Sequence, residues 1–153
     1  MLRSEKEAEK RNSYEDRNVI NGTFGECWID NDYMAEAIGL EAKIKLDTTE
    51  VKMTGTLSKG TKVTGKSGSG TVKLNKISSY FIKRMAADLK AGKATRATII
   101  TNLEDPEAFG AEKIALNNCV FTELTIADWE AGKLCEESVP FTFSDFDVLE
   151  AIE

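Results

Sequence analysis

Apolar and polar residues alternate strictly along the segment EAIGLEAKIKLDTTEVKM at 36–53. One set of alternate positions is apolar and the other is charged; the apolar set is Ile38, Leu40, Ala42, Ile44 and Leu46, and the charged set is Glu41, Lys43, Lys45 and Asp47. Successive side chains of a strand point to opposite faces of a sheet. The segment therefore predicts a strand with one face toward a core and the other toward solvent.

Similar patterns predict further strands at 23–32, 71–77, 95–103, 113–126 and 134–152. The change of phase at Asn117 and Asn118 predicts a β-bulge, and Pro140 favours an edge position or a bulge because proline lacks the N–H of a sheet ladder. One amphipathic helix is expected at 78–92, with Phe81, Met85 and Leu89 on its apolar stripe. Ser78 or Ser79 is expected to cap the helix, and Gly92 to end it. The predicted fold is mainly β: an antiparallel β-sandwich or rolled sheet with one flanking α-helix.

The chain has the length of one domain with a core, 153 residues. We expect an N-terminal arm at 1–20, either a loose terminus or an arm that orders on a neighbour, and a main domain at 21–153. No apolar stretch approaches the roughly 20 residues of a membrane span, and no secretory signal is visible, so we expect no membrane span and a cytosolic origin.

Catalytic chemistry finds little support in the residues. The chain has no histidine, and its three cysteines, Cys27, Cys119 and Cys135, form no C-x-x-C pair, so we expect reduced thiols. The motif D-N-D at 30–32 is interpreted as a turn rather than a calcium loop. Trp28 and Trp129 are expected in the core, and Lys83, Arg84 and Lys90 on a solvated helix face. We predict no enzyme, no metal and no cofactor.

The stretch GTKVTGKS at 60–67 matches the phosphate-binding pattern G-x-x-x-x-G-K-[ST]. That loop needs a buried strand before it and a helix starting at its lysine. Here MTGTLSK precedes it, and GSGTVKLNKI follows it with two glycines and a further strand pattern. We therefore interpret 54–70 as a polar, glycine-rich connection or extended hairpin rather than a nucleotide site.

Exposed strand edges need a partner, and the chain offers little helix to cover them. Pairing with neighbouring copies would close a ring. The alternative is a monomeric β-sandwich that acts as a ligand-binding module. A net charge of −6 argues against wrapping nucleic acid.

Three stretches resemble the tail tube proteins of contractile phages and phage tail-like bacteriocins, of the type found in defective prophages of Gram-positive bacteria. These are NVINGTFGECWIDND at 18–32, GTLSKGTKVTGKSGSGTVKLNKISSYF at 55–81 and VPFTFSDFDVLEAI at 139–152. The resemblance implies a tail-tube fold and a structural role. Hexameric rings would stack into a hollow tube lined by a continuous β-barrel.

The resemblance also implies sites and partners. A hairpin would reach the adjacent ring; its residues are Gly55, Thr56, Leu57, Lys59, Gly60, Lys62, Gly65 and Lys66. The candidates for the lumen are Glu41, Lys43, Lys45, Asp47, Lys73 and Asn75. Expected partners are further copies of the chain, a tail sheath, and baseplate and tape-measure proteins, with DNA passing through the lumen without specific binding. The location would be a virion or tail-like particle assembled in the bacterial cytoplasm.

Overall fold

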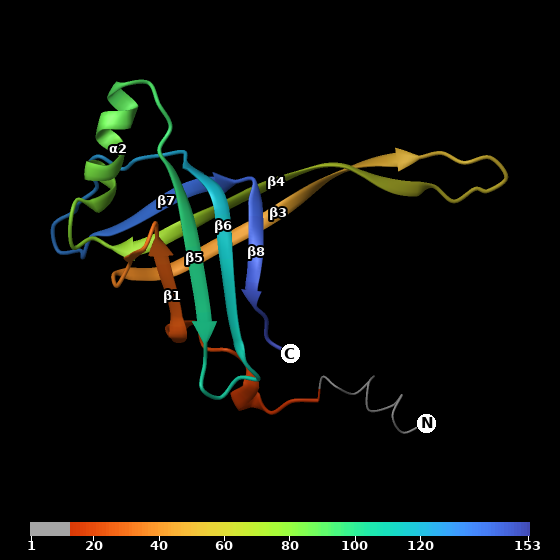
Figure 1. Ribbon diagram of the computed structural model, residues 1–153, viewed down its shortest axis with the longest axis horizontal. Helices are drawn as coiled ribbons and strands as arrows, with labels where there is room; N and C mark the ends of the chain where they lie inside the picture. The colour runs from red at the N-terminus through yellow and green to blue at the C-terminus, as the bar shows by residue number, and fades with distance from the viewer. Residues whose placement is uncertain (1–12) are drawn as a thin grey trace.

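The computed structural model describes residues 13–153, which form one antiparallel sheet and one α-helix (Figure 1). The strands are β1 (Gly25–Ile29), β2 (Asp32–Tyr33), β3 (Ala37–Val51), β4 (Gly60–Asn75), β5 (Arg96–Glu104), β6 (Ala111–Phe121), β7 (Glu136–Phe143) and β8 (Asp145–Glu150). Helix α2 is Tyr80–Lys90, and two 3-10 turns, η1 (Asp16–Asn18) and η2 (Gly22–Phe24), precede β1. The predicted mainly β, antiparallel class with one flanking helix is confirmed.

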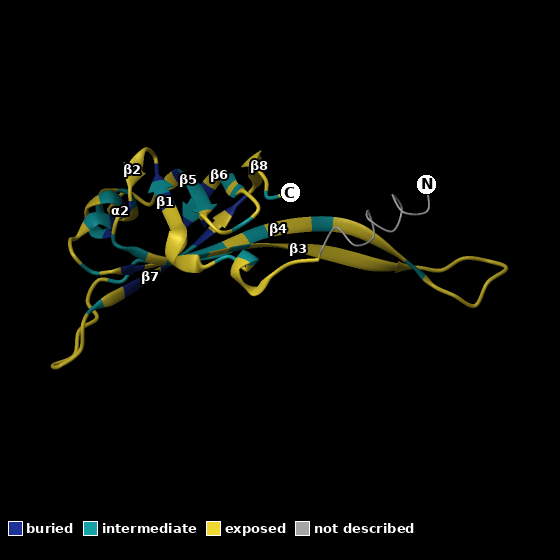
Figure 2. Cartoon of the chain, turned by 90° about the horizontal axis from the view of Figure 1, so that it is seen from below, coloured by how far each residue is buried: buried dark blue, intermediate teal, exposed yellow. Residues whose placement is uncertain are grey.

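The sheet rolls over itself into two layers. Its strand order is β2-β1-β5-β6-β7-β4-β3, with β8 also paired to β6. Strands β3, β4 and β7 form one layer, which crosses beneath β1, β5, β6 and β8 (Figures 1 and 2). The core lies between the layers, and α2 adds Phe81 and Met85 to it. The fully buried side chains are Ile29, Val72, Phe81, Met85, Ile99, Cys119, Val139 and Phe141.

Strand β6 carries the bulge that the sequence predicts. Asn118 has a φ of 54°, and the partner on β5 steps from Ala97 to Ile99 at this point. The extra residue restores the inward direction of the side chains, so that Leu116 and Cys119 both enter the core. Asparagine tolerates this left-handed conformation better than most residues.

The final strand predicted at 134–152 is in fact two strands, and this prediction was wrong. β7 pairs with β6 at Val120 and Phe121, whereas β8 pairs with β6 between Lys113 and Asn117. The chain passes from one layer to the other at Ser144, opposite the bulge, where the Ser144 amide donates to the Asn117 carbonyl at 3.3 Å. The strand predicted to end at 126 ends at Phe121.

Pro140 lies where the β6–β7 ladder stops. Its carbonyl accepts a hydrogen bond from the Thr122 amide at 3.0 Å, just beyond the last residue of β6. The amide and carbonyl of one strand residue point to the same side of the strand. The Pro140 nitrogen, which has no hydrogen to donate, therefore points toward the end of β6 rather than toward β4. The predicted edge position therefore holds locally, although β7 as a whole lies between β4 and β6.

The glycine-rich stretch predicted as a connection at 54–70 is mostly strand. Only residues 52–59 form the turn, and from Gly60 onward the chain pairs with β3. Lys66 pairs with Leu46 and Ser67 with Lys45, and no helix begins there. The structure thus supports the extended hairpin and excludes the phosphate-binding loop.

Two glycines of this stretch lie beneath phenylalanine rings. Gly68 pairs with Phe143 and Gly70 with Phe141 in the β4–β7 register. A Cβ atom on Gly70 would lie 2.6 Å from Phe141 Cζ, and one on Gly68 would lie 2.7 Å from Phe143 Cε2. These positions lack side chains because the rings of β7 occupy the space.

Helix α2 follows its predicted stripe only in part. Phe81 and Met85 are buried, but Leu89 is exposed. Ser79 occupies the N-cap without a side-chain hydrogen bond, so the predicted cap is wrong, while Gly92 ends the helix with a φ of 72° as expected. Arg84 is not on a solvated face, because it pairs with Asp30 in the turn between β1 and β2.

A tyrosine joins the start of α2 to the same turn. The Tyr80 hydroxyl donates to Asp32 Oδ2 at 2.9 Å. Burial and this carboxylate raise the pKa of Tyr80 to about 12. The turn residues Asp30 and Asn31 both have positive φ, as a tight hairpin requires, so the D-N-D motif begins with a turn as expected, and Asp32 starts β2.

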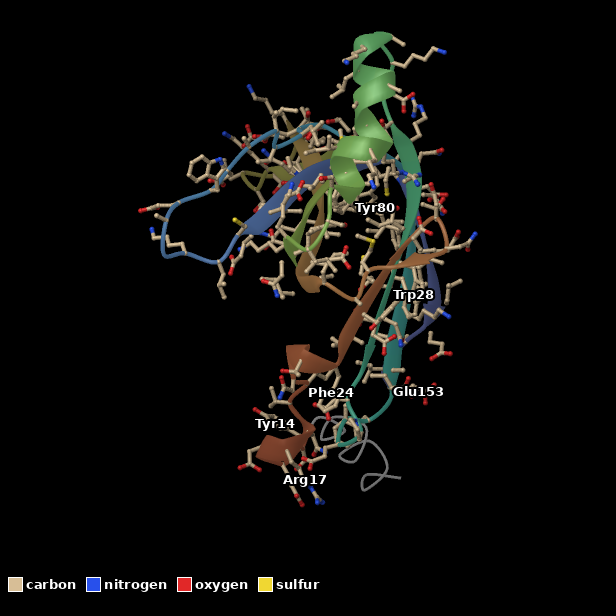
Figure 3. The ribbon with its side chains drawn as sticks, turned by 90° about the vertical axis from the view of Figure 1, so that its left-hand side faces the viewer. Tyr14, Arg17, Phe24, Trp28, Tyr80 and Glu153 are labelled. Atoms are coloured by element: carbon tan, nitrogen blue, oxygen red, sulfur yellow. The ribbon has the colours of Figure 1, made fainter. Side chains whose placement is uncertain are left out.

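The first part of the predicted arm, 1–12, lies outside the described residues. The remainder is held against the loop after β5: the Asn18 side-chain amide donates to the Glu107 carbonyl at 3.0 Å, and the Asn21 amide donates to Asp105 Oδ2 at 2.9 Å. Figure 3 shows Tyr14, Arg17 and Phe24 at the same end of the molecule as Glu153, away from α2.

Candidate functional site

One face of the β3–β4–β7 layer is polar and lies away from the core. The six residues predicted for a lumen share this face by strand alternation and register, and all six are exposed: Glu41, Lys43, Lys45 and Asp47 on β3, and Lys73 and Asn75 on β4. The charges are mixed, and Lys43 Nζ lies 3.1 Å from Glu41 Oε1. Such an exposed pair adds little stability. The face offers a solvated surface of low net charge.

The opposite face of the same hairpin is apolar but only half covered. Leu40 and Ala42 pack against the core, whereas farther out Ile44 is 39% exposed, Leu46 52% and Val63 51%. The prediction that one face of this strand belongs to the core therefore holds only for its inner half. An opening of about 440 Å³ between the layers, lined by Ile44, Leu103, Ile114 and Phe146 among others, leads to the uncovered part. An apolar surface of this kind marks an interaction site.

Strand β3 is also an edge. It pairs with β4 alone among the strands of the described residues, over the length Ala37–Val51. Its outer main-chain groups form a row of donors and acceptors that another strand can use. The same strand thus presents a free edge and an uncovered apolar face.

The hairpin tip projects far beyond the body of the protein (Figure 1). Of the residues predicted to reach a neighbour, Gly55, Thr56, Leu57 and Lys59 lie in the turn, and Gly60, Lys62, Gly65 and Lys66 lie in the outer part of β4. Leu57 is fully exposed. Between Val51 and Lys66 the sequence has four lysines and no acidic residue.

The loop 122–135, between β6 and β7, is longer than the connection at 127–133 left between the two predicted strands, and its exposed apolar side chains were not predicted. It carries three large exposed apolar side chains: Ile126, Trp129 and Leu134. Trp129 was expected in the core, which is wrong, since its side chain is 79% exposed. The alternation of Leu124 and Ile126 extended the predicted strand to 126 and hid the full length of this loop, although loops of this length are commonly functional.

The two ends of this loop are fixed to the sheet. The Lys76 amide donates to the Cys135 carbonyl at 2.9 Å, and the Thr122 amide donates to the Pro140 carbonyl. Its outer turn is closed by the Lys133 amide on the Glu130 carbonyl at 3.2 Å, with Gly132 at a φ of 83°. The loop is therefore presented in a definite place.

The cysteines are three free thiols, two of them buried. Burial raises the pKa of Cys27 and of Cys119 to about 11, so both stay protonated near neutral pH. Within residues 13–153 no group of histidine, cysteine or acidic side chains is placed to hold a metal ion. In the same range no helix has the length and apolar character of a membrane span.

Thiol labelling of the unassembled subunit tests this description. At pH 8 a pKa of about 11 leaves about 0.1% of a thiol as reactive thiolate, so Cys27 and Cys119 should react slowly. Cys135, which is partly exposed, should give the one fast phase with an aromatic disulfide reagent. Cys135→Ser should remove that phase, and unfolding in urea should expose the other two thiols. A fast phase that survives Cys135→Ser would contradict the burial.

Comparisons with known proteins agree with one another. A family described as "Phage tail tube protein" matches residues 12–150. The phage-like element PBSX protein XkdM of Bacillus subtilis (strain 168) is 33% identical over 138 residues, which cover 89% of this chain and 94% of that protein. The uncharacterized protein YqbM of the same strain is 33% identical over 139 residues, 90% of this chain and 95% of that protein.

A solved structure shows the same fold at low sequence identity. It is a chain of the PVC sheath–tube complex, an extracellular contractile injection system in its extended state. The TM-score is 0.69 at 10% identity, and the match covers 91% of this chain and 100% of that chain.

Proposed function

The chain belongs to the phage tail tube protein family, which is structural rather than enzymatic, and from this premise we propose that its copies stack as hexameric rings into the inner tube of a contractile tail or tail-like bacteriocin. A tail sheath would surround the tube. The same particle would contain baseplate and tape-measure proteins. Assembly would take place in the bacterial cytoplasm, before the particle is released.

The observation that carries the proposal is the unfinished hairpin of β3 and β4. Its outer half has an uncovered apolar face at Ile44, Leu46 and Val63 and a free strand edge on β3. Burial of apolar surface contributes about 25 cal/mol per Å², so a second copy that covers this face is strongly favoured. A strand edge gains its missing hydrogen bonds from the same contact.

The polar face of the layer then becomes the wall of the channel. It lies opposite the apolar face, so copies joined through their apolar surfaces and edges would turn Glu41, Lys43, Lys45, Asp47, Lys73 and Asn75 inward. The mixed charge of these residues offers no positive track for phosphates. DNA would pass such a wall without specific binding.

Electron microscopy tests this function directly. The purified protein is expected to form rings and tubes of uniform diameter that become more abundant as its concentration rises. Leu46→Asp, on the apolar face, should prevent assembly because a charge would be buried in the contact. Lys45→Asp, next to it on the polar face, is the matched control and should still assemble. Circular dichroism checks that both variants are folded.

One result would refute the proposal. A solution mass that stays that of a single chain at every concentration, with no rings in the micrographs, would instead favour a monomeric β-sandwich that binds a ligand.

A further inference from the structure

We infer that the loop 122–135 of one copy receives the hairpin tip, 52–59, of a copy in the next ring. This inference rests on the proposed stacking and adds to it the surface that accepts the hairpin. The loop is outside all the segments that the sequence analysis assigned to assembly.

The first argument is the position of the two segments. The hairpin tip lies at one end of the longest axis of the molecule, and the loop 122–135 lies at the other end (Figures 1 and 2). Copies that stack in one orientation make head-to-tail contacts, in which different surfaces meet. With the longest axis along the stack, the tip that projects from one copy meets the opposite end of the next copy.

The second argument is apolar surface on both sides. At the tip, Met53 is 53% exposed and Leu57 is 102% exposed. On the loop, Ile126 is 70% exposed, Trp129 79% and Leu134 95%. Both groups are exposed among residues 13–153. Tryptophan in particular is enriched where protein surfaces bind one another.

The third argument is charge, which differs in sign between the loop and helix α2. The outer hairpin carries Lys52, Lys59, Lys62 and Lys66, of which Lys59 lies 3.5 Å from Glu50 Oε1 and the other three have no such pair among the described residues. The loop carries three carboxylates, Glu123, Asp128 and Glu130, against one lysine, Lys133, which is paired with Glu130 at 3.0 Å. Helix α2 exposes two basic side chains, Lys83 and Lys90, while Arg84 is paired with Asp30. A lysine-rich tip is attracted to the loop and repelled by the helix.

Cysteine cross-linking of assembled tubes tests the contact. In a Cys135→Ser background, Leu57→Cys is combined with Trp129→Cys, and the tubes are mildly oxidised. A disulfide requires the two Cα atoms to come within about 7 Å. The pair should give a ladder of covalent multimers on a non-reducing gel, and each single variant should lose that ladder. The ladder should extend past six copies, because each ring is joined to the next.

The control is a second pair of cysteines, in which the partner of Leu57→Cys lies on α2 instead of on the loop. Leu57→Cys with Leu89→Cys places the second thiol on α2, at a residue that is 52% exposed, and should not cross-link. If Trp129→Cys prevents assembly, Asp128→Cys replaces it as a second probe of the loop.

The outcomes are distinct. Tubes that cross-link through Leu89→Cys, or through neither loop position, overturn the inference alone. A ladder that stops at six copies places the contact within one ring and also overturns it. Failure of the unaltered protein to form tubes refutes the proposed function, and this inference with it.

Discussion

Gly70→Val is expected to cost roughly 3 kcal/mol or more in the free energy of unfolding, and to leave little native subunit at 37 °C. A Cβ atom at this position would lie 2.6 Å from Phe141 Cζ and 3.1 Å from Ala42 Cα, and it would also meet the Glu41 carbonyl. The obstacles lie on both flanking strands, β3 and β7, and two of them are main chain. Neither strand can move away without losing its main-chain hydrogen bonds to β4, so the clash cannot be relieved by a small shift.

Gly65→Ala is the matched control on the same strand. The nearest atom to a Cβ there is Asp47 Oδ2 at 3.1 Å, the end of an exposed side chain that can rotate away. The expected change is within about 1 kcal/mol. Urea unfolding followed by circular dichroism compares the two midpoints. Equal midpoints for Gly70→Val and the unaltered protein would show that the Phe141 ring does not cover this residue.

Replacing residues 52–59 by Asn-Gly is expected to abolish tubes while leaving the subunit folded. Val51 and Gly60 are paired, so a two-residue turn can close the hairpin directly between them. The removed residues are exposed and contribute nothing to the core, so stability should change by no more than about 1 kcal/mol. Assembly should fail because the segment that we propose to reach the next ring is missing.

Sedimentation and electron microscopy measure this loss. The length-preserving variant Thr54→Ala is the control, because it alters the tip without shortening it, and it should still form tubes. Tubes of normal abundance from the shortened chain would refute the role predicted for the hairpin residues.

The local part of the fold could be predicted from the sequence. Alternation at 36–53 identified β3, and the phase change at Asn117 and Asn118 identified the bulge, because both patterns are set within a few neighbouring residues. The apolar stripe of Phe81 and Met85 identified the helix for the same reason.

The remainder depends on partners distant in the sequence. The glycines at 68 and 70 were assigned to a glycine-rich connection or extended hairpin. Their place in the sheet was not predicted, because no nearby residue shows that they pair with Phe143 and Phe141. The change of layer at Ser144 depends on where β6 bends. The exposure of Trp129 could not be predicted for the same reason. Tryptophan is usually largely buried, and only the three-dimensional position of its loop shows that this one is exposed.

The placement of the tip and the loop at opposite ends has a consequence for size control (Figure 1). If each added subunit exposes the same two contact surfaces, growth has no natural stopping point. Nothing in such a polymer limits the number of its subunits. In the proposed stack, a particle of defined length therefore needs other components to set its length and to end its growth.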